Sequence, residues 1–108
     1  MKVTFGSILL YFIVCNTAIA GTLVKDKTIK EIITGWNGEA VYVKLNESIT
    51  PVESCTSIVF RMEPNTPLFK ENVSFLLSAF HAQSKVSLYV DGCIGTSIHL
   101  KAVTLKRG

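Results

Sequence analysis

Few side chains in this sequence have the types and spacing that catalysis needs. A hydrolase requires a nucleophile, a base and a group that orients the base, or paired carboxylates, or a cluster of metal ligands. The chain has two scattered histidines, His81 and His99, and it lacks a nucleophile-elbow motif and a CxxC pair. We therefore expect no enzymatic activity, no metal and no cofactor, and a small hydrolase is kept only as an alternative.

The first 20 residues have the order of a secretory signal peptide. Lys2 precedes an apolar run, and the run ends in the small residues Ala18-Ile19-Ala20. Cleavage is expected after Ala20, so residues 1–20 are interpreted as a signal peptide and residues 21–108 as one domain. The domain is then secreted or periplasmic.

The sequence predicts neither a membrane span nor binding to nucleic acid. A membrane anchor needs about 20 uninterrupted apolar residues, and the polar pair at 16–17 ends the run too early. Lipid attachment at Cys15 is a weaker alternative, because Val14 stands where a small residue is expected. Nucleic acid is not expected either, because the protein is exported and its net charge is only +2 once Lys2 is subtracted from the +3 of the whole chain.

Cys55 and Cys93 are the two cysteines of the mature domain. An oxidising compartment favours their pairing, and the bond would close a loop of 38 residues (93 minus 55). A domain of 88 residues (108 minus 20) benefits from such a covalent link. A disulfide is the prediction, and a reactive thiol or a metal ligand is the alternative.

Alternating and helical patterns predict five strands and one helix. An Asn-Gly turn at 37–38 joins the first two strands, and the turn pair Asp91-Gly92 is expected to end the fourth. The first and last strands are expected to contain bulges, because their alternation changes phase. The expected strands are 28–34, 40–45, 55–62, 86–90 and 97–105.

The helix is expected between the third and fourth strands. Thr66 is the expected N-cap and Pro67 the first helical residue. Apolar residues then recur at helical spacing, and Phe75, Leu76, Leu77 and Phe80 are expected to plug the interior of the sheet. The order β-β-β-α-β-β predicts a mainly β protein, a five-stranded OB-fold Greek-key barrel with one helix and one disulfide.

Residues 28–105 also resemble a family, the small exported OB-fold proteins related to the pentameric B subunits of bacterial AB-type toxins. The resemblance is to the subtilase cytotoxin and pertussis-like branch. It rests on the stretch at 32–38, on Cys55, on SFLLSAFHAQSK at 74–85, and on VSLYVDGC at 86–93. It implies a cell-surface glycan as ligand, a homopentamer, and a separate exported enzymatic subunit as partner. By resemblance, Tyr89 is a ligand-binding residue.

The outward residues of the barrel are the other candidates for ligand binding. OB barrels commonly use the face of their second and third strands, where Tyr42 and Arg61 are expected. Sugars stack on aromatic rings and accept hydrogen bonds from planar charged groups. The predicted glycan-binding set is Tyr42, Arg61, Tyr89 and Trp36. The alternative is an exported protein that contacts or inhibits another protein without binding a glycan.

Overall fold

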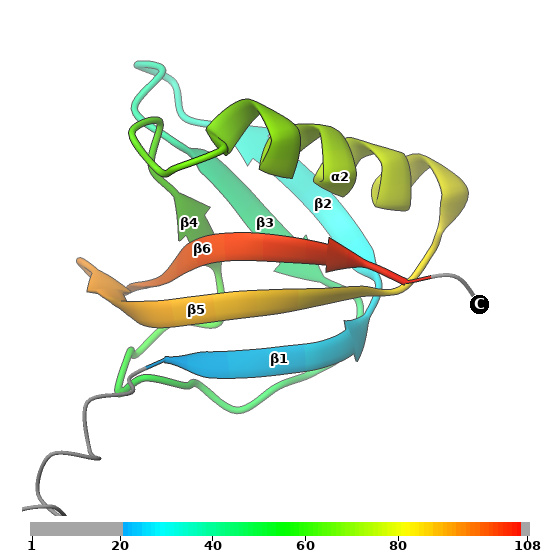
Figure 1. The fold of residues 1–108 in the computed structure, drawn as a ribbon. Helices are drawn as coiled ribbons and strands as arrows, with labels where there is room; N and C mark the ends of the chain where they lie inside the picture. Colours follow the sequence, from blue (N-terminus) through cyan, green and yellow to red (C-terminus); the bar gives the residue numbers. More distant parts are fainter. Residues whose placement is uncertain (1–20, 107–108) are drawn as a thin grey trace, which may run out of the picture.

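Six strands and one helix make up the fold (Figure 1). The computed structural model describes residues 21–106, and the predicted signal peptide lies outside them. The elements in chain order are β1 (Thr22–Lys27), β2 (Ile29–Thr34), β3 (Val41–Leu45), β4 (Phe60–Met62), α2 (Phe69–Ala82), β5 (Val86–Ile94) and β6 (Ser97–Leu105).

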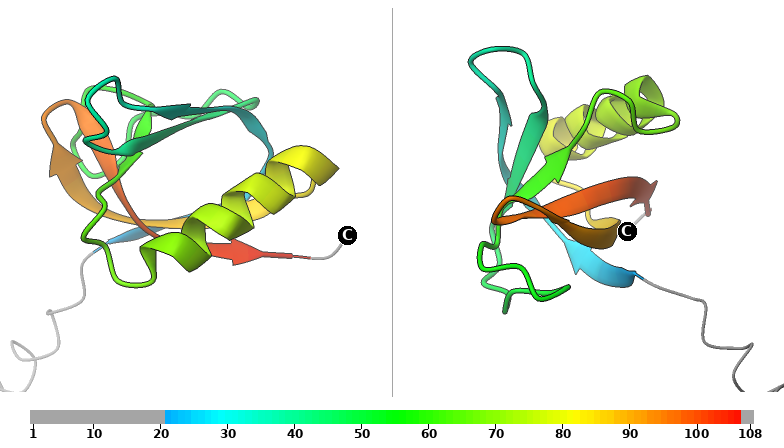
Figure 2. Two further views of the ribbon diagram at one scale, coloured as in Figure 1. Left: turned by 90° about the horizontal axis from the view of Figure 1, so that it is seen from above. Right: turned by 90° about the vertical axis from the view of Figure 1, so that its left-hand side faces the viewer.

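The strands form one mixed sheet in the order β1-β5-β6-β4-β3-β2. Neighbouring strands are antiparallel except for β4 and β6, which are parallel. The sheet curves strongly around its own buried face (Figure 2). β1 and β2 are the outermost strands of this order, although Thr28 alone separates them in the chain.

Side-chain hydrogen bonds hold the bend at Thr28. The Asn46 backbone N–H donates to the Thr28 carbonyl at 3.0 Å, and Asn46 Nδ2 donates to Thr28 Oγ1 at 2.9 Å. Glu47 accepts from the Thr28 backbone N–H at 3.0 Å and from its hydroxyl at 2.9 Å. The chain therefore turns from one outer strand to the other at a point where the loop after β3 fastens it.

The core lies between the curved sheet and α2, which packs against β6 and β2 (Figure 1). Val86, Leu88 and Val90 all point inward from β5 and are fully buried, as their alternation predicts. Val43 and Phe60 are equally inaccessible on β3 and β4. Tyr42 and Lys44 alternate with the buried residues of β3 and are not buried, which also confirms the prediction.

Both predicted bulges are present. The pairing of β2 with β3 shifts between Ile29 and Glu31. On β6, Leu100 pairs with Val90 and Ala102 with Tyr89, so Lys101 is the extra residue. This shift is the reason why Leu100 and Val103 are both buried despite their odd spacing.

The prediction of five strands is wrong, because the described chain has six. β1 was missed since TLVKDK contains one buried residue, Val24, and too little alternation to be recognised. The expected strand at 55–62 is also too long, because only Phe60–Met62 is regular. Positive φ angles at Glu53 and Ser54 turn the chain just before Cys55. From there to Val59 the backbone forms isolated hydrogen bonds with the β5–β6 turn instead of a regular strand ladder. One of them runs from the Ser57 backbone N–H to the Thr96 carbonyl.

Asp91-Gly92 does not end its strand, contrary to the prediction. β5 continues to Ile94, and the turn to β6 lies at 95–96. The pairing shifts between Val90 and Cys93, and Gly92 has a φ of 80°. A glycine with positive φ serves a bulge as well as a turn, and the local sequence does not distinguish the two.

The helix begins later than predicted and without the predicted cap. Leu68 occupies the N-cap position in a left-handed conformation, and no side chain caps the helix. Thr66 is buried instead, and its hydroxyl has no hydrogen-bond partner among the described residues. Of the four expected plug residues only Leu76 is fully buried, while Phe75, Leu77 and Phe80 are 42%, 52% and 38% exposed.

Asn72 joins the helix to the bulge of β6. Its side chain is buried, accepts from the Val103 backbone N–H at 3.3 Å, and donates to the Lys101 carbonyl at 3.5 Å. A bulge leaves backbone groups outside the regular ladder. Asn72 therefore satisfies polar backbone groups that the strand pairing leaves over.

The predicted disulfide between Cys55 and Cys93 is present, with Cα atoms 5.7 Å apart. It links the loop before β4 to the bulged end of β5. Next to it, the Glu53 carboxylate accepts hydrogen bonds from the Thr22 hydroxyl and, at 3.1 Å, from the Gly92 backbone N–H. The loop before β4 is therefore attached to both β1 and β5.

Glu53 makes the stability of the fold depend on pH. The hydrogen bond from Thr22, followed by that from Gly92, lowers the pKa of Glu53 below its usual 4.5. A lowered folded-state pKa stabilises the fold above about pH 4.5, and this stabilisation is lost as the pH falls through the folded pKa. In E53Q, the decrease in the free energy of unfolding on acidification from pH 7 to pH 3 is expected to be smaller than in the wild type.

Urea denaturation at a series of pH values measures this difference. T22V removes the hydrogen bond from the Thr22 hydroxyl to Glu53, and it is expected to reduce part of the same loss of stability at acidic pH. Parallel pH curves for E53Q and the wild type would contradict the assignment.

Candidate functional site

The sheet aligns four partly exposed side chains in one row on its outer face. The register pairs Ile33 with Tyr42, Tyr42 with Arg61, and Arg61 with His99. The row therefore crosses β2, β3, β4 and β6. Residues paired across a sheet project from the same face, so two of the predicted ligand-binding residues, Tyr42 and Arg61, are neighbours.

Two carboxylates hold Tyr42 and Arg61 in place. The Tyr42 hydroxyl donates to Glu39 at 3.1 Å, and Arg61 Nε donates to Glu63. The guanidinium carbon of Arg61 lies 5.6 Å from the centre of the Tyr42 ring, which is cation–π distance. We call these four residues, Glu39, Tyr42, Arg61 and Glu63, the Tyr42–Arg61 surface.

Hydrogen bonds within this surface favour the charged forms of Arg61 and Glu39 near neutral pH. The hydrogen bond to Glu63 raises the pKa of Arg61. Glu39 is stabilised as a carboxylate, since bonds from its own backbone amide and from Tyr42 lower its pKa. Partial burial and the bond to Glu39 raise the pKa of Tyr42, so the phenol keeps its proton. The surface thus presents one cation and two anions.

His99 extends the row on β6, as its outward alternation predicted. Its pKa is lowered, first by partial burial and then by Lys101. The carboxylates of Glu63 and Asp91 oppose this shift. The imidazole next to Arg61 therefore favours its neutral form, which offers one donor and one acceptor.

Trp36 lies in the turn between β2 and β3 and is completely exposed. The same turn carries Glu39, which accepts from the Asn37 backbone N–H at 3.2 Å. The turn is therefore fastened to the Tyr42–Arg61 surface through Glu39. The indole projects from its tip as a free aromatic face.

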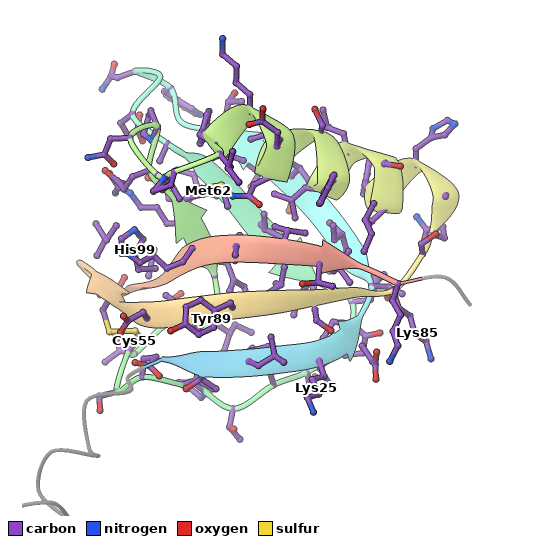
Figure 3. The ribbon with its side chains drawn as sticks, viewed as in Figure 1. Lys25, Cys55, Met62, Lys85, Tyr89 and His99 are labelled. Carbon is purple, nitrogen blue, oxygen red and sulfur yellow. A yellow bond between two sulfur atoms is a disulfide. The ribbon has the colours of Figure 1, made fainter. Side chains whose placement is uncertain are left out.

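Tyr89, the fourth predicted ligand-binding residue, lies elsewhere. It lies on β5 (Figure 3), where it pairs with Leu23 of β1 and Ala102 of β6. In the sheet, β6 separates β5 from β4, which carries Arg61. Tyr89 lies so close to Gly21 that a side chain at that position would clash with its ring and hydroxyl, so the ring packs closely against the chain before β1. The structure brings Tyr42 and Arg61 together and does not bring Tyr89 to them.

The described residues offer no cluster for a metal. No group of three or more histidine, cysteine or carboxylate side chains within 21–106 has the arrangement of a metal site. Among the same residues, no helix has both the length and the apolar character to span a membrane. The chemistry that the Tyr42–Arg61 surface offers is hydrogen bonding and stacking.

Glu39 and Glu63 were missed as members of the site. Glu39 immediately precedes the predicted second strand, and Glu63 was interpreted only as part of a strand-ending Glu-Pro pair. The available signal was spacing, because Glu63 lies two residues after Arg61 and therefore on the same face of an extended chain. A carboxylate at that distance from an arginine is a natural partner.

Comparison of the chain with protein-family models, with curated proteins and with solved structures finds no match. The function must therefore be argued from the side chains of the molecule.

Proposed function

We propose that this protein is a secreted or periplasmic binding module without catalysis that recognises a glycan through the Tyr42–Arg61 surface and Trp36. The observation that carries the proposal is the guanidinium of Arg61 held over the ring of Tyr42, with a carboxylate bound to each. Sugars have apolar C–H faces and many hydroxyls, and this surface combines aromatic faces with fixed donors and acceptors.

The curvature of the sheet supports an OB-type barrel as the scaffold. β1 and β2, which Thr28 alone separates, would together take the place of the bent first strand of such a barrel, since β1 pairs with β5 and β2 pairs with β3. In such a barrel β3 and β4 correspond to the second and third strands, whose face commonly binds oligomeric ligands. The disulfide supports an oxidising compartment.

The charges of the surface indicate which glycans it prefers. Two carboxylates surround one guanidinium, and both carboxylates already accept hydrogen bonds from the protein. An acidic sugar would meet repulsion from Glu39 and Glu63 as well as attraction to Arg61. We therefore expect neutral sugars to bind more tightly than acidic sugars of the same size.

Truncation of the Tyr42–Arg61 surface is the direct test. Y42A and R61A are each expected to weaken glycan binding about tenfold or more, the effect of removing a central aromatic or arginine contact. A glycan array with the mature domain identifies the sugar, and isothermal titration then gives the dissociation constants. Y89A is the control, because it removes a partly exposed tyrosine from another part of the sheet.

Loss of binding in Y89A but not in Y42A would contradict this placement of the site. An array without any binding, together with co-purification of a protein partner, would favour the alternative function in protein–protein contact. One observation supports that alternative: three large apolar side chains of α2, Phe75, Leu77 and Phe80, are exposed.

A further inference from the structure

A cavity of about 260 Å³ lies where β3 ends and the following loop folds back toward β4. Its apolar lining comes from Leu45 at the end of β3, Ile49 in the loop, and Ile58 and Val59 just before β4. Leu45 and Ile49 also pack against the core, so they form a fixed floor. Ile58 is 46% exposed and stands at the side.

Three charged residues complete the lining: Lys30 on β2, Lys44 on β3, and Glu47. Both Glu47 oxygens are directed at Thr28, which donates to them through its backbone N–H and its hydroxyl. Burial opposes ionisation of Glu47, but these bonds outweigh it and lower its pKa. Glu47 therefore remains a carboxylate with its oxygens bonded to Thr28, and the lining of the cavity carries two positive charges and one negative charge.

The ammonium groups of Lys30 and Lys44 are free to bind an anion more readily than they would be in a strong internal ion pair. The Lys44 ammonium lies 3.7 Å from Glu31, and both side chains are about half exposed, so this ion pair is weak and easily exchanged. Within residues 21–106 the structure records no ion pair for Lys30. A lining that combines apolar side chains with two lysines and one carboxylate is complementary to a ligand with an apolar body and a single negative charge.

We propose that this cavity binds a small amphipathic monoanion, a carboxylate on an apolar chain or ring. The volume lies just below the usual range of roughly 300 to 1,000 Å³ for drug-sized ligands, so the body is short. The apolar part contacts Leu45, Ile49 and Ile58, and the carboxylate lies between Lys30 and Lys44. The site is distinct from the Tyr42–Arg61 surface, although Lys44 and Tyr42 project from the same face of β3, and it does not depend on glycan binding.

Titration with octanoate, followed by nuclear magnetic resonance of the mature domain, tests this proposal. Saturable shifts are expected for the methyl groups of Leu45, Ile49 and Ile58. Acetate shares the head group without the chain, and octylammonium shares the chain with the opposite charge. Both are expected to bind at least about tenfold more weakly than octanoate.

The double variant K30Q/K44Q is expected to weaken octanoate binding about fivefold or more. K70Q is the matched control, because it neutralises an exposed lysine of α2. I58E is a second variant, whose half-exposed position accepts a charge and whose carboxylate repels the ligand. The unfolding midpoint of each variant verifies that it is folded.

Three results would overturn the proposal. The first is the absence of saturable shifts with octanoate, and the second is equal binding of octylammonium. The third is an equal loss of affinity in K70Q and in K30Q/K44Q. None of these outcomes affects the glycan test, because they concern another set of residues and another ligand.

Discussion

Replacing both Cys55 and Cys93 with alanine is expected to lower the free energy of unfolding by about 4 kcal/mol. The disulfide closes a loop of 38 residues, and the loss follows from the greater conformational freedom of the unfolded chain without that closure. A domain of this size has a total stability of roughly 5 to 15 kcal/mol. Urea denaturation of the two proteins measures the difference.

Reduction provides the control for this prediction. A reductant is expected to shift the wild-type unfolding curve toward that of the double variant and to leave the double variant unchanged. Alanine differs from cysteine only by the sulfur atom, and of the two cysteines only Cys55 is buried. The double variant therefore removes little packing apart from the disulfide itself. A loss below about 1 kcal/mol would show that the bond contributes little to the stability of the fold.

F60A is expected to lower the free energy of unfolding by about 3 to 5 kcal/mol, the usual cost of emptying the space of a buried phenylalanine. Phe60 is fully inaccessible and lies between Val43 on β3 and Ile98 on β6. It is therefore at the point where the parallel pair joins the rest of the sheet. Chemical denaturation with an intrinsic fluorescence or circular dichroism readout measures the effect.

I58A is the matched control, because Ile58 lies two residues before Phe60 and an extended chain would place both on the same face. The structure buries Phe60 and Met62 but leaves Ile58 46% exposed. I58A is therefore expected to cost less than about 1 kcal/mol, in line with substitutions at partly exposed sites. Equal losses in I58A and F60A would mean that Ile58 belongs to the core after all.

The strands that the sequence predicts best are those in which every second residue is buried. β3 and the first half of β5, up to Val90, alternate regularly, and Val43, Val86, Leu88 and Val90 are inaccessible as expected. Alternation is a local property of extended chain, so it needs no knowledge of the partner strand. The disulfide was equally predictable, because the two cysteines that follow residue 20 have a single possible pairing with each other.

Other elements depend on partners that are distant in the sequence. β1 forms because its backbone pairs with the edge of β5, whereas its own residues show little alternation of buried and exposed positions. Asp91-Gly92 is a bulge because β6 continues beside it, and Thr66 is buried before the helix instead of capping it. In each case the local sequence permits two conformations, and packing selects one.

The candidate site shows the same division. The residue types in the sequence indicate the chemistry of Tyr42, Arg61, Tyr89 and Trp36, but not which of them are neighbours. The register of β3 with β4 places Tyr42 beside Arg61, whereas β6 separates Arg61 from Tyr89. The cavity is lined by residues of β2, of β3 and of the chain between β3 and β4. No local sequence pattern predicts that these residues meet.

The amino-acid sequence by itself determined the mainly β class, the inward faces of the regular strands, the helix near 69–82 and the disulfide, since these depend on local periodicity or on cysteine count. The tertiary structure decided the sixth strand, the parallel pairing, the members of the Tyr42–Arg61 surface and the cavity. These features depend on which strands lie side by side. Strand pairing joins residues that are distant in the sequence, and it is selected by the burial of one face of the whole sheet.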